Sequence, residues 1–170
     1  MNNVILIGMP SSGKSTLGVL LAKLLGYDFI DTDLLIQKAE GKHLQDIINE
    51  KGLAYFKARE AETLLALDCD RTVIATGGSA VYDEAAMTHL REIGRVIYLS
   101  VPFSAVEERL QNLSTRGVVM EKGTTLRSLY DERAPLYEKY AHLTFDETEG
   151  GVSRSMAENA SALYELLTAE

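Results

Sequence analysis

The segment from Gly8 to Ser15 contains the residue types of a phosphate-binding loop. It reads Gly8-Met9-Pro10-Ser11-Ser12-Gly13-Lys14-Ser15 and matches the pattern G-x-x-x-x-G-K-[ST] in full. Glycines allow such a loop to wrap a phosphate with its N–H groups pointing inward, and the helix that follows adds its positive N-terminal end. The lysine reaches the β- and γ-phosphate oxygens, and the serine hydroxyl coordinates Mg²⁺. The sequence therefore predicts that ATP and Mg²⁺ bind here, through Gly8, Ser11, Ser12, Gly13, Lys14, Ser15 and Thr16.

Two carboxylates, Asp31 and Asp33, flank Thr32 directly after an apolar run. A phosphotransferase needs one carboxylate near Mg²⁺ and another that orients or deprotonates the acceptor hydroxyl. We assign the first role to Asp31, as a metal-site residue, and the second to Asp33. An alternative interpretation is that one of the two caps the N-terminus of the following helix.

The elements that must position these residues are short apolar runs alternating with helical patterns. The runs predict strands at 4–7, 27–30, 72–75, 96–99 and 143–145. Helices are expected at 15–25, at 32–68 with breaks near Gly41 and Gly52, and at 83–92, 103–112, 126–140 and 152–168. This order predicts right-handed βαβ crossovers and an α/β fold with a mostly parallel sheet.

Three of the predicted strands end in polar or glycine-rich turns. These turns begin at Gly8, at Asp31 and at Gly77, where the sequence reads Gly77-Gly78-Ser79. Because ligands of parallel sheets bind at the carboxyl ends of the strands, we expect the three turns to face one cleft.

Composition narrows the possible partners. The chain has 170 residues and a net charge of −8, with no block of Lys and Arg, which argues against a nucleic-acid partner. No apolar run approaches the ~20 residues that span a bilayer, and the N-terminal stretch does not read as a signal peptide. We expect one domain over 1–170, a cytoplasmic monomer, and a small-molecule partner without nucleic acid or membrane.

At this point the chain resembles the shikimate kinase family, from Val4 to about Asp146. The resemblance is carried by the phosphate loop through Thr16, Asp31-Thr32-Asp33, Phe56-Lys57-Ala58-Arg59-Glu60, Ala75-Thr76-Gly77-Gly78-Ser79 and Arg133-Ala134-Pro135-Leu136-Tyr137. It implies a three-layer P-loop NTPase fold with about five parallel strands flanked by helices. It also implies an acceptor-binding helical segment at about 32–62 and a mobile lid at about 112–125. The activity implied is transfer of the γ-phosphoryl group of ATP to a hydroxyl of a small carboxylate, shikimate, in aromatic amino acid biosynthesis.

The resemblance also implies roles for single residues. Asp33 would hold acceptor hydroxyls, Arg133 the acceptor carboxylate, and Gly77 with Gly78 would line the acceptor site. Arg116 would be the catalytic arginine of the lid. Arg109 would stack near adenine, although a plain surface arginine is an equal alternative.

Three departures from the family pattern bear on the acceptor. Lys57 stands where the family has arginine, and a compact ammonium cannot form the bidentate pair that a guanidinium forms with a carboxylate. Ser79 replaces the third glycine of a turn, and the lid reads Arg116-Gly117-Val118 instead of Arg-Pro-Leu. We keep Lys57 and Ser79 as acceptor-binding candidates. The rivals are a kinase of the same fold for another hydroxy acid or amino acid, and a nucleotide-binding regulatory protein without an acceptor.

Overall fold

The computed structural model describes residues 2–111, 120–149 and 151–169. Within these residues, five strands form one parallel sheet in the order β2-β3-β1-β4-β5. The strands are β1 (Asn3–Ile7), β2 (Asp28–Asp31), β3 (Thr72–Ala75), β4 (Gly94–Ser100) and β5 (Leu143–Asp146). The predicted α/β fold with a parallel sheet is confirmed.

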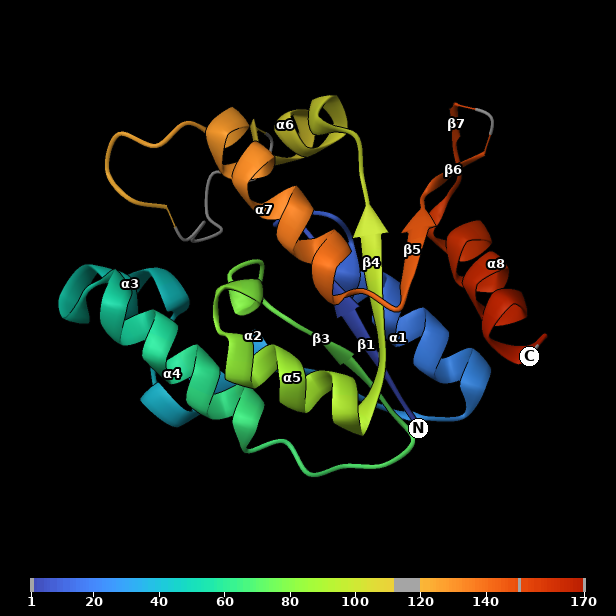
Figure 1. The fold of residues 1–170 in the computed structure, drawn as a ribbon, viewed down its shortest axis with the longest axis horizontal. Helices are drawn as coiled ribbons and strands as arrows, with labels where there is room; N and C mark the ends of the chain where they lie inside the picture. The colour runs from blue at the N-terminus through green and yellow to red at the C-terminus, as the bar shows by residue number, and fades with distance from the viewer. Residues whose placement is uncertain (1, 112–119, 150, 170) are drawn as a thin grey trace.

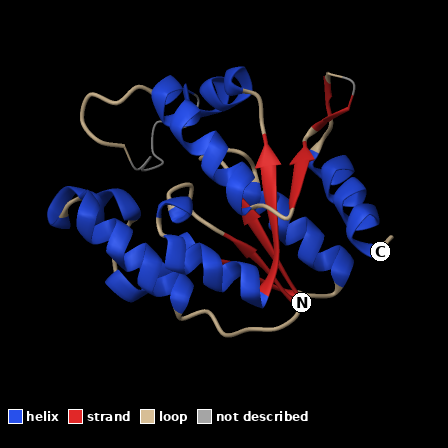
Figure 2. Ribbon diagram, in the orientation of Figure 1, coloured by secondary structure: helices blue, strands red, loops and turns tan. Residues whose placement is uncertain are grey.

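Helices follow the strands along the chain and cover both faces of the sheet (Figures 1 and 2). They are α1 (Lys14–Leu25), α2 (Thr32–Glu40), α3 (Leu44–Lys51), α4 (Leu53–Leu65), α5 (Glu84–Ile93), α6 (Phe103–Gln111), α7 (Leu126–Tyr140) and α8 (Met156–Thr168). A short 3-10 helix, η1 (Ala80–Tyr82), follows β3, and β6 (Thr148–Glu149) pairs with β7 (Val152–Ser153) in an antiparallel hairpin. None of the described helices is long and apolar enough to cross a membrane.

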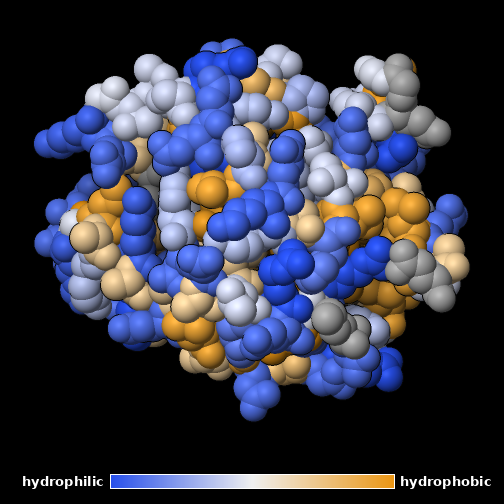
Figure 3. All heavy atoms as spheres, viewed as in Figure 1, coloured by the Kyte–Doolittle hydropathy of each residue, from blue (hydrophilic) through white to orange (hydrophobic). Residues whose placement is uncertain are grey.

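The central strand β1 divides the interior into two cores. Ile5 and Ile7 pack with residues of α4, α5 and α7 on one face, whereas Val4 and Leu6 pack with residues of α1 and α8 on the other. This alternation is expected of a strand that is buried on both sides. The result is three layers, with the sheet between them. On the face shown in Figure 3, hydrophilic side chains predominate and apolar side chains surface between them.

The strand order places three chain segments at one edge of the sheet. β3 lies between β2 and β1, and Ala75 is in register with both Asp31 and Leu6. The carboxyl ends of the three strands therefore meet, and the turns that follow them are neighbours in space although they are far apart in the sequence.

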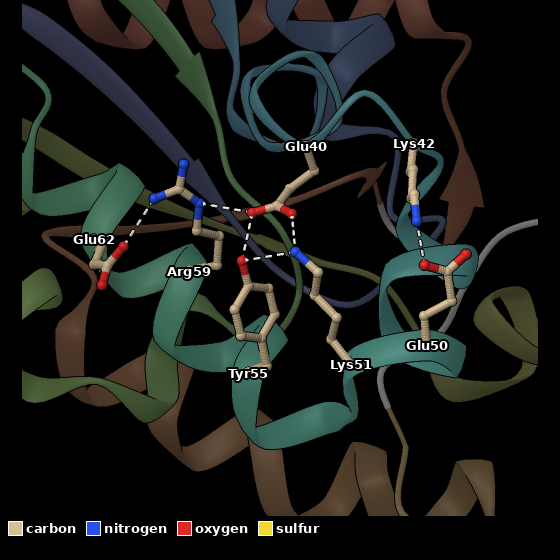
Figure 4. A network of polar contacts seen from close by, with 7 residues as sticks. All are labelled: Glu40, Lys42, Glu50, Lys51, Tyr55, Arg59 and Glu62. Carbon is tan, nitrogen blue, oxygen red and sulfur yellow. Dashed lines mark hydrogen bonds and ion pairs between the residues drawn. The ribbon is translucent and has the colours of Figure 1, made fainter.

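Helices α2, α3 and α4 form a layer of their own beside this edge, around a small core of Ile36, Ile47 and Phe56. Figure 4 shows that charged side chains also join the three helices. Glu40 of α2 accepts hydrogen bonds from Lys51 Nζ of α3 at 2.7 Å and from Tyr55 of α4 at 2.8 Å. It also pairs with Arg59 Nε of α4 at 3.0 Å. The hydrogen bond from Lys51 is the main reason that the pKa of Glu40 is lowered.

The predicted C-terminal helix begins later than the sequence pattern indicates. We expected it at 152–168, but α8 begins at Met156. Val152 and Ser153 belong instead to the β6–β7 hairpin. Ser155 then caps the helix, because its side chain accepts from Glu158 N while Glu158 accepts from Ser155 N.

Candidate active site

A cleft of about 370 Å³ opens at the edge of the sheet where β1, β2 and β3 end. All three predicted turns contribute to it, as expected, together with residues from α2, α4 and α7. Its polar lining includes Ser11, Lys14, Ser15, Thr16, Asp31, Asp33, Glu60, Thr76, Ser79 and Arg133.

The phosphate loop surrounds the amino group of Lys14. Lys14 is 7% exposed, and its Nζ donates to Gly8 O at 2.8 Å, Met9 O at 2.7 Å and Ser12 Oγ at 3.3 Å. The loop can curl this tightly because Gly8 and Gly13 have φ values of 149° and 87°, in a region that favours glycine. α1 begins at Lys14, so that its N-terminal amides face the same space. The loop therefore has the shape and charge for a nucleotide's phosphates.

Ser15 and Asp31 meet across the nucleotide end of the cleft. Ser15 Oγ donates to Asp31 Oδ2 at 2.6 Å. The other oxygen, Oδ1, accepts from the backbone N of Asp33 at 3.0 Å and of Leu34 at 3.4 Å, so that Asp31 is also the N-cap of α2. The N-cap interpretation therefore applies to Asp31, and its role at a metal site stays a prediction.

These two oxygen ligands fit Mg²⁺ that is shared with a phosphate. Mg²⁺ prefers oxygen ligands and usually combines one or two protein ligands with waters and substrate phosphates. Within the described residues, no group of three or more His, Cys, Asp and Glu side chains is placed to hold a metal ion. The donor set at Ser15 and Asp31 therefore suits an ion that arrives with the nucleotide.

At the acceptor end, two carboxylates lie over Gly77. A Cβ on Gly77 would clash with Glu60 Oε1 and would lie 2.9 Å from Asp33 Oδ1. Any larger residue at this position would therefore displace the two acids, and the glycine lets them lie this close to the turn. Asp33 comes from the first turn of α2 and Glu60 from α4, so the small turn after β3 brings together acids from two helices.

Glu60 is a cleft residue that is not among the catalytic or binding candidates from the sequence. It is 2% exposed and accepts a hydrogen bond from Ser79 Oγ. Burial, helped by the nearby Asp33, raises the pKa of Glu60 to about 7 against the lowering effect of that hydrogen bond. One signal was available: Glu60 follows the buried Phe56 by four residues, which places both on one helix face.

We predict that Glu60→Gln removes a pH dependence of folding stability. The folded-state pKa of about 7 lies above the ordinary pKa of 4.5 for a glutamate carboxyl, so the folded protein binds more protons than the unfolded chain between these two pH values. The stability that Glu60 contributes to the folded state is therefore fully present below pH 4.5 and is lost as the pH rises through 7. The difference in unfolding free energy between wild type and variant should change by on the order of 3 kcal/mol across this window.

Urea unfolding at several pH values measures this difference. Glu62→Gln is the matched control, because the Glu62 side chain lies on the same helix but is 66% exposed. Parallel stability curves for wild type and Glu60→Gln would contradict the prediction.

The two predicted acceptor cations are separated in the structure. Arg133 of α7 is 1% exposed and lines the cleft. Lys57 does not line it; its side chain lies in a second cavity of about 180 Å³, with Glu60, Ser79 and Tyr82 among the lining residues. The Lys57 ammonium sits over the ring of Tyr82, with Nζ 4.6 Å from the ring centroid. In this structure Lys57 is not among the residues that line the cleft beside Asp33, whereas Glu60 and Ser79 line both cavities. Binding of the acceptor by Lys57 stays a prediction.

The remaining predicted residues lie toward the nucleotide end. Arg109 of α6 donates through Nη1 to Ser11 O at 3.3 Å and pairs through Nη2 with Glu147 at 2.7 Å. This places its guanidinium group against the phosphate loop, and the partner Glu147 was not predicted. Arg116, and with it residues 112–119 of the predicted lid, lie outside the described residues.

Comparison with known proteins gives one consistent family. The family model described as shikimate kinase matches residues 10–164. The shikimate kinase of Clostridium botulinum (strain 657 / Type Ba4) is 40% identical over 143 residues, which cover 82% of this chain and 84% of that protein. The shikimate kinase of Thermodesulfovibrio yellowstonii is 35% identical over 171 residues and covers 99% of this chain and 98% of its own. A solved structure of the Acinetobacter baumannii enzyme in complex with shikimate has a TM-score of 0.88 at 30% identity, over 99% of this chain and 94% of that one.

Proposed function

Because the chain belongs to the shikimate kinase family, we propose that it transfers the γ-phosphoryl group of ATP to a hydroxyl of shikimate, with Mg²⁺ as the metal ion. The observation that supports this most is the single cleft in which the phosphate loop, Asp33 and Arg133 meet. A nucleotide-binding regulator requires the loop but not an acid and a buried arginine beyond it. The proposal places the protein in the cytoplasm, where ATP is available, as a monomer with a small-molecule partner.

At the nucleotide end, the loop amides and Lys14 bind the phosphates and stabilise the charge on the transferred group. Ser15 and Asp31 would hold Mg²⁺, which would supply positive charge to the phosphates. Arg109, fixed by Glu147, would cover the adenine side.

At the acceptor end, Asp33 orients the acceptor hydroxyl and takes its proton as the oxygen bonds to phosphorus and the bond to the β-phosphate breaks. Arg133 binds the acceptor carboxylate, and Gly77, Gly78 and Ser79 line the approach. Because both ends of the cleft follow neighbouring strands of one sheet, the nucleotide and the acceptor would be held side by side.

A coupled assay of ADP release tests this function. Purified full-length protein is given ATP and Mg²⁺ with shikimate, with a panel of hydroxy acids and hydroxy amino acids including quinate and L-serine, or without acceptor. Release that requires shikimate, with a phosphorylated product seen by mass spectrometry, is the expected result. Release with another acceptor alone would support the same-fold rival, and acceptor-independent hydrolysis would support the regulatory rival.

A further inference from the structure

Tyr82 lies between the two cations that the sequence assigned to the acceptor. It is the last residue of η1, directly after the turn Gly77-Gly78-Ser79. Lys57 Nζ is 4.6 Å from the centroid of its ring, and the guanidinium carbon of Arg133 is 5.2 Å from the same centroid. An aromatic ring attracts cations at such distances. Tyr82 therefore contacts both groups at once, although they belong to different cavities.

The hydroxyl of Tyr82 holds Arg133 in one orientation. It accepts from Arg133 Nε at 3.1 Å and donates to Glu132 Oε1 at 2.5 Å. Burial and the bond to Glu132 raise the pKa of Tyr82, so that the hydroxyl keeps the proton it donates at neutral pH. Because Nε is engaged by Tyr82, the opposite end of the guanidinium group is directed to the cleft, where Nη1 lies against Gly78. That end can form a bidentate pair with a carboxylate.

The ring of Tyr82 also accounts for the position of Lys57. The ammonium lies in the second cavity, beyond the Glu60–Ser79 hydrogen bond, and not in the lining of the cleft. Its charge can reach the acceptor carboxylate only across these buried groups and the ring. Lys57 thus contacts the Tyr82 ring, while Arg133 contacts both the ring and the hydroxyl.

We propose that Tyr82 is a positioning residue for the acceptor carboxylate: by holding Arg133 through its hydroxyl and Lys57 on its ring, it makes Arg133 the group that selects a carboxylate-bearing acceptor. This inference rests on the proposed function. It assigns a role to a position that the sequence motifs leave without one, and it makes the substitution of lysine for arginine at position 57 compatible with carboxylate binding.

The test uses two acceptors that differ at one group, shikimate and its neutral carboxamide. Tyr82→Phe keeps the ring and removes the hydroxyl. It should raise KM for shikimate by about 10-fold, as for the loss of a hydrogen bond to a charged group, and change kcat by less than about twofold. KM for the carboxamide should change by less than about twofold, because no carboxylate is present for Arg133 to bind. In an Arg133→Lys background, Tyr82→Phe should raise KM for shikimate by less than about a further twofold, because the effects of residues that act through one another are not additive.

Tyr164→Phe on α8, remote from the cleft, is the control for removing a tyrosine hydroxyl. Differential scanning calorimetry on every variant separates loss of binding from loss of folded protein. If Tyr82→Phe weakens both acceptors equally, or adds its full effect in the Arg133→Lys background, Tyr82 is not a positioning residue. A wild type that does not phosphorylate shikimate overturns the proposed function and this inference together, whereas an active wild type with equal losses overturns this inference alone.

Discussion

Replacing Lys14 with methionine should lower kcat for phosphoryl transfer by at least about 10²–10³-fold while the fold is kept. Methionine preserves most of the aliphatic stem but removes the charge that the carbonyls of Gly8 and Met9 hold inside the loop. In turnover that charge faces the β- and γ-phosphates, where negative charge moves as the bond breaks. The loss should therefore appear in kcat as well as in the affinity for ATP. Coupled kinetics and nucleotide titration measure the two quantities separately.

Lys23→Met is the matched control for this prediction. Lys23 lies in the last turn of the same helix and is exposed. The control should leave both constants within about twofold of wild type, since exposed substitutions away from specific contacts have small effects. Circular dichroism shows whether each variant is folded. Near-normal turnover by a folded Lys14→Met protein would contradict the role of the phosphate loop in phosphoryl transfer.

Asp33→Asn should lower kcat by about 10²–10⁴-fold, the range over which a positioned general base contributes. Asparagine has nearly the same shape and retains one oxygen that can accept a hydrogen bond, but it cannot take the proton of the acceptor hydroxyl. The substitution also leaves Gly77 uncrowded, so the turn that carries Ser79 keeps its position. KM for ATP should change little, because Asp33 lies at the acceptor end. Steady-state kinetics with shikimate at saturating ATP give the result.

Two other aspartates provide comparisons. Asp31→Asn keeps the cap of α2, because asparagine is as good an N-cap as aspartate, but it weakens the charge beside Ser15. Its expected signature is a higher Mg²⁺ concentration for half-maximal activity. Asp46→Asn, exposed on α3, is the inert control. If Asp33→Asn retains full kcat, another group accepts the proton, and the assignment of Asp33 as the base is wrong.

The sequence predicted correctly those features that depend on neighbouring residues alone. The phosphate loop could be located because the glycines, the lysine and the start of α1 are contiguous, so local spacing determines their arrangement. The strands could be located because β1 and β3 are buried on both faces and read as unbroken apolar runs. The meeting of three turns in one cleft then followed from the rule that ligands of parallel sheets bind at the carboxyl ends of the strands, whereas the order of the strands is known from the structure alone.

The positions of Lys57 and Glu60 could not be read in the same way. Both lie on α4, and the rotation of that helix against η1 decides which side chain reaches the cleft. That rotation depends on packing among Phe56, Leu64 and residues distant in sequence. The hairpin before α8 was missed for a related reason, because its pairs join residues in two-residue strands too short to show an alternating pattern.

The two ends of the cleft are anchored in regions that open at different free energies. The phosphate loop continues directly from β1, the strand between the two main cores, so unfolding the strand that anchors the loop requires disruption of both cores. Asp33 begins a layer whose own core is small, with Ile36, Ile47 and Phe56 at its centre. Only α4 of this layer is also tied to a main core, through Leu64. We therefore expect α2 and α3 to open first under mild stress, which would give a form that retains the nucleotide loop but has lost the order of its acceptor end.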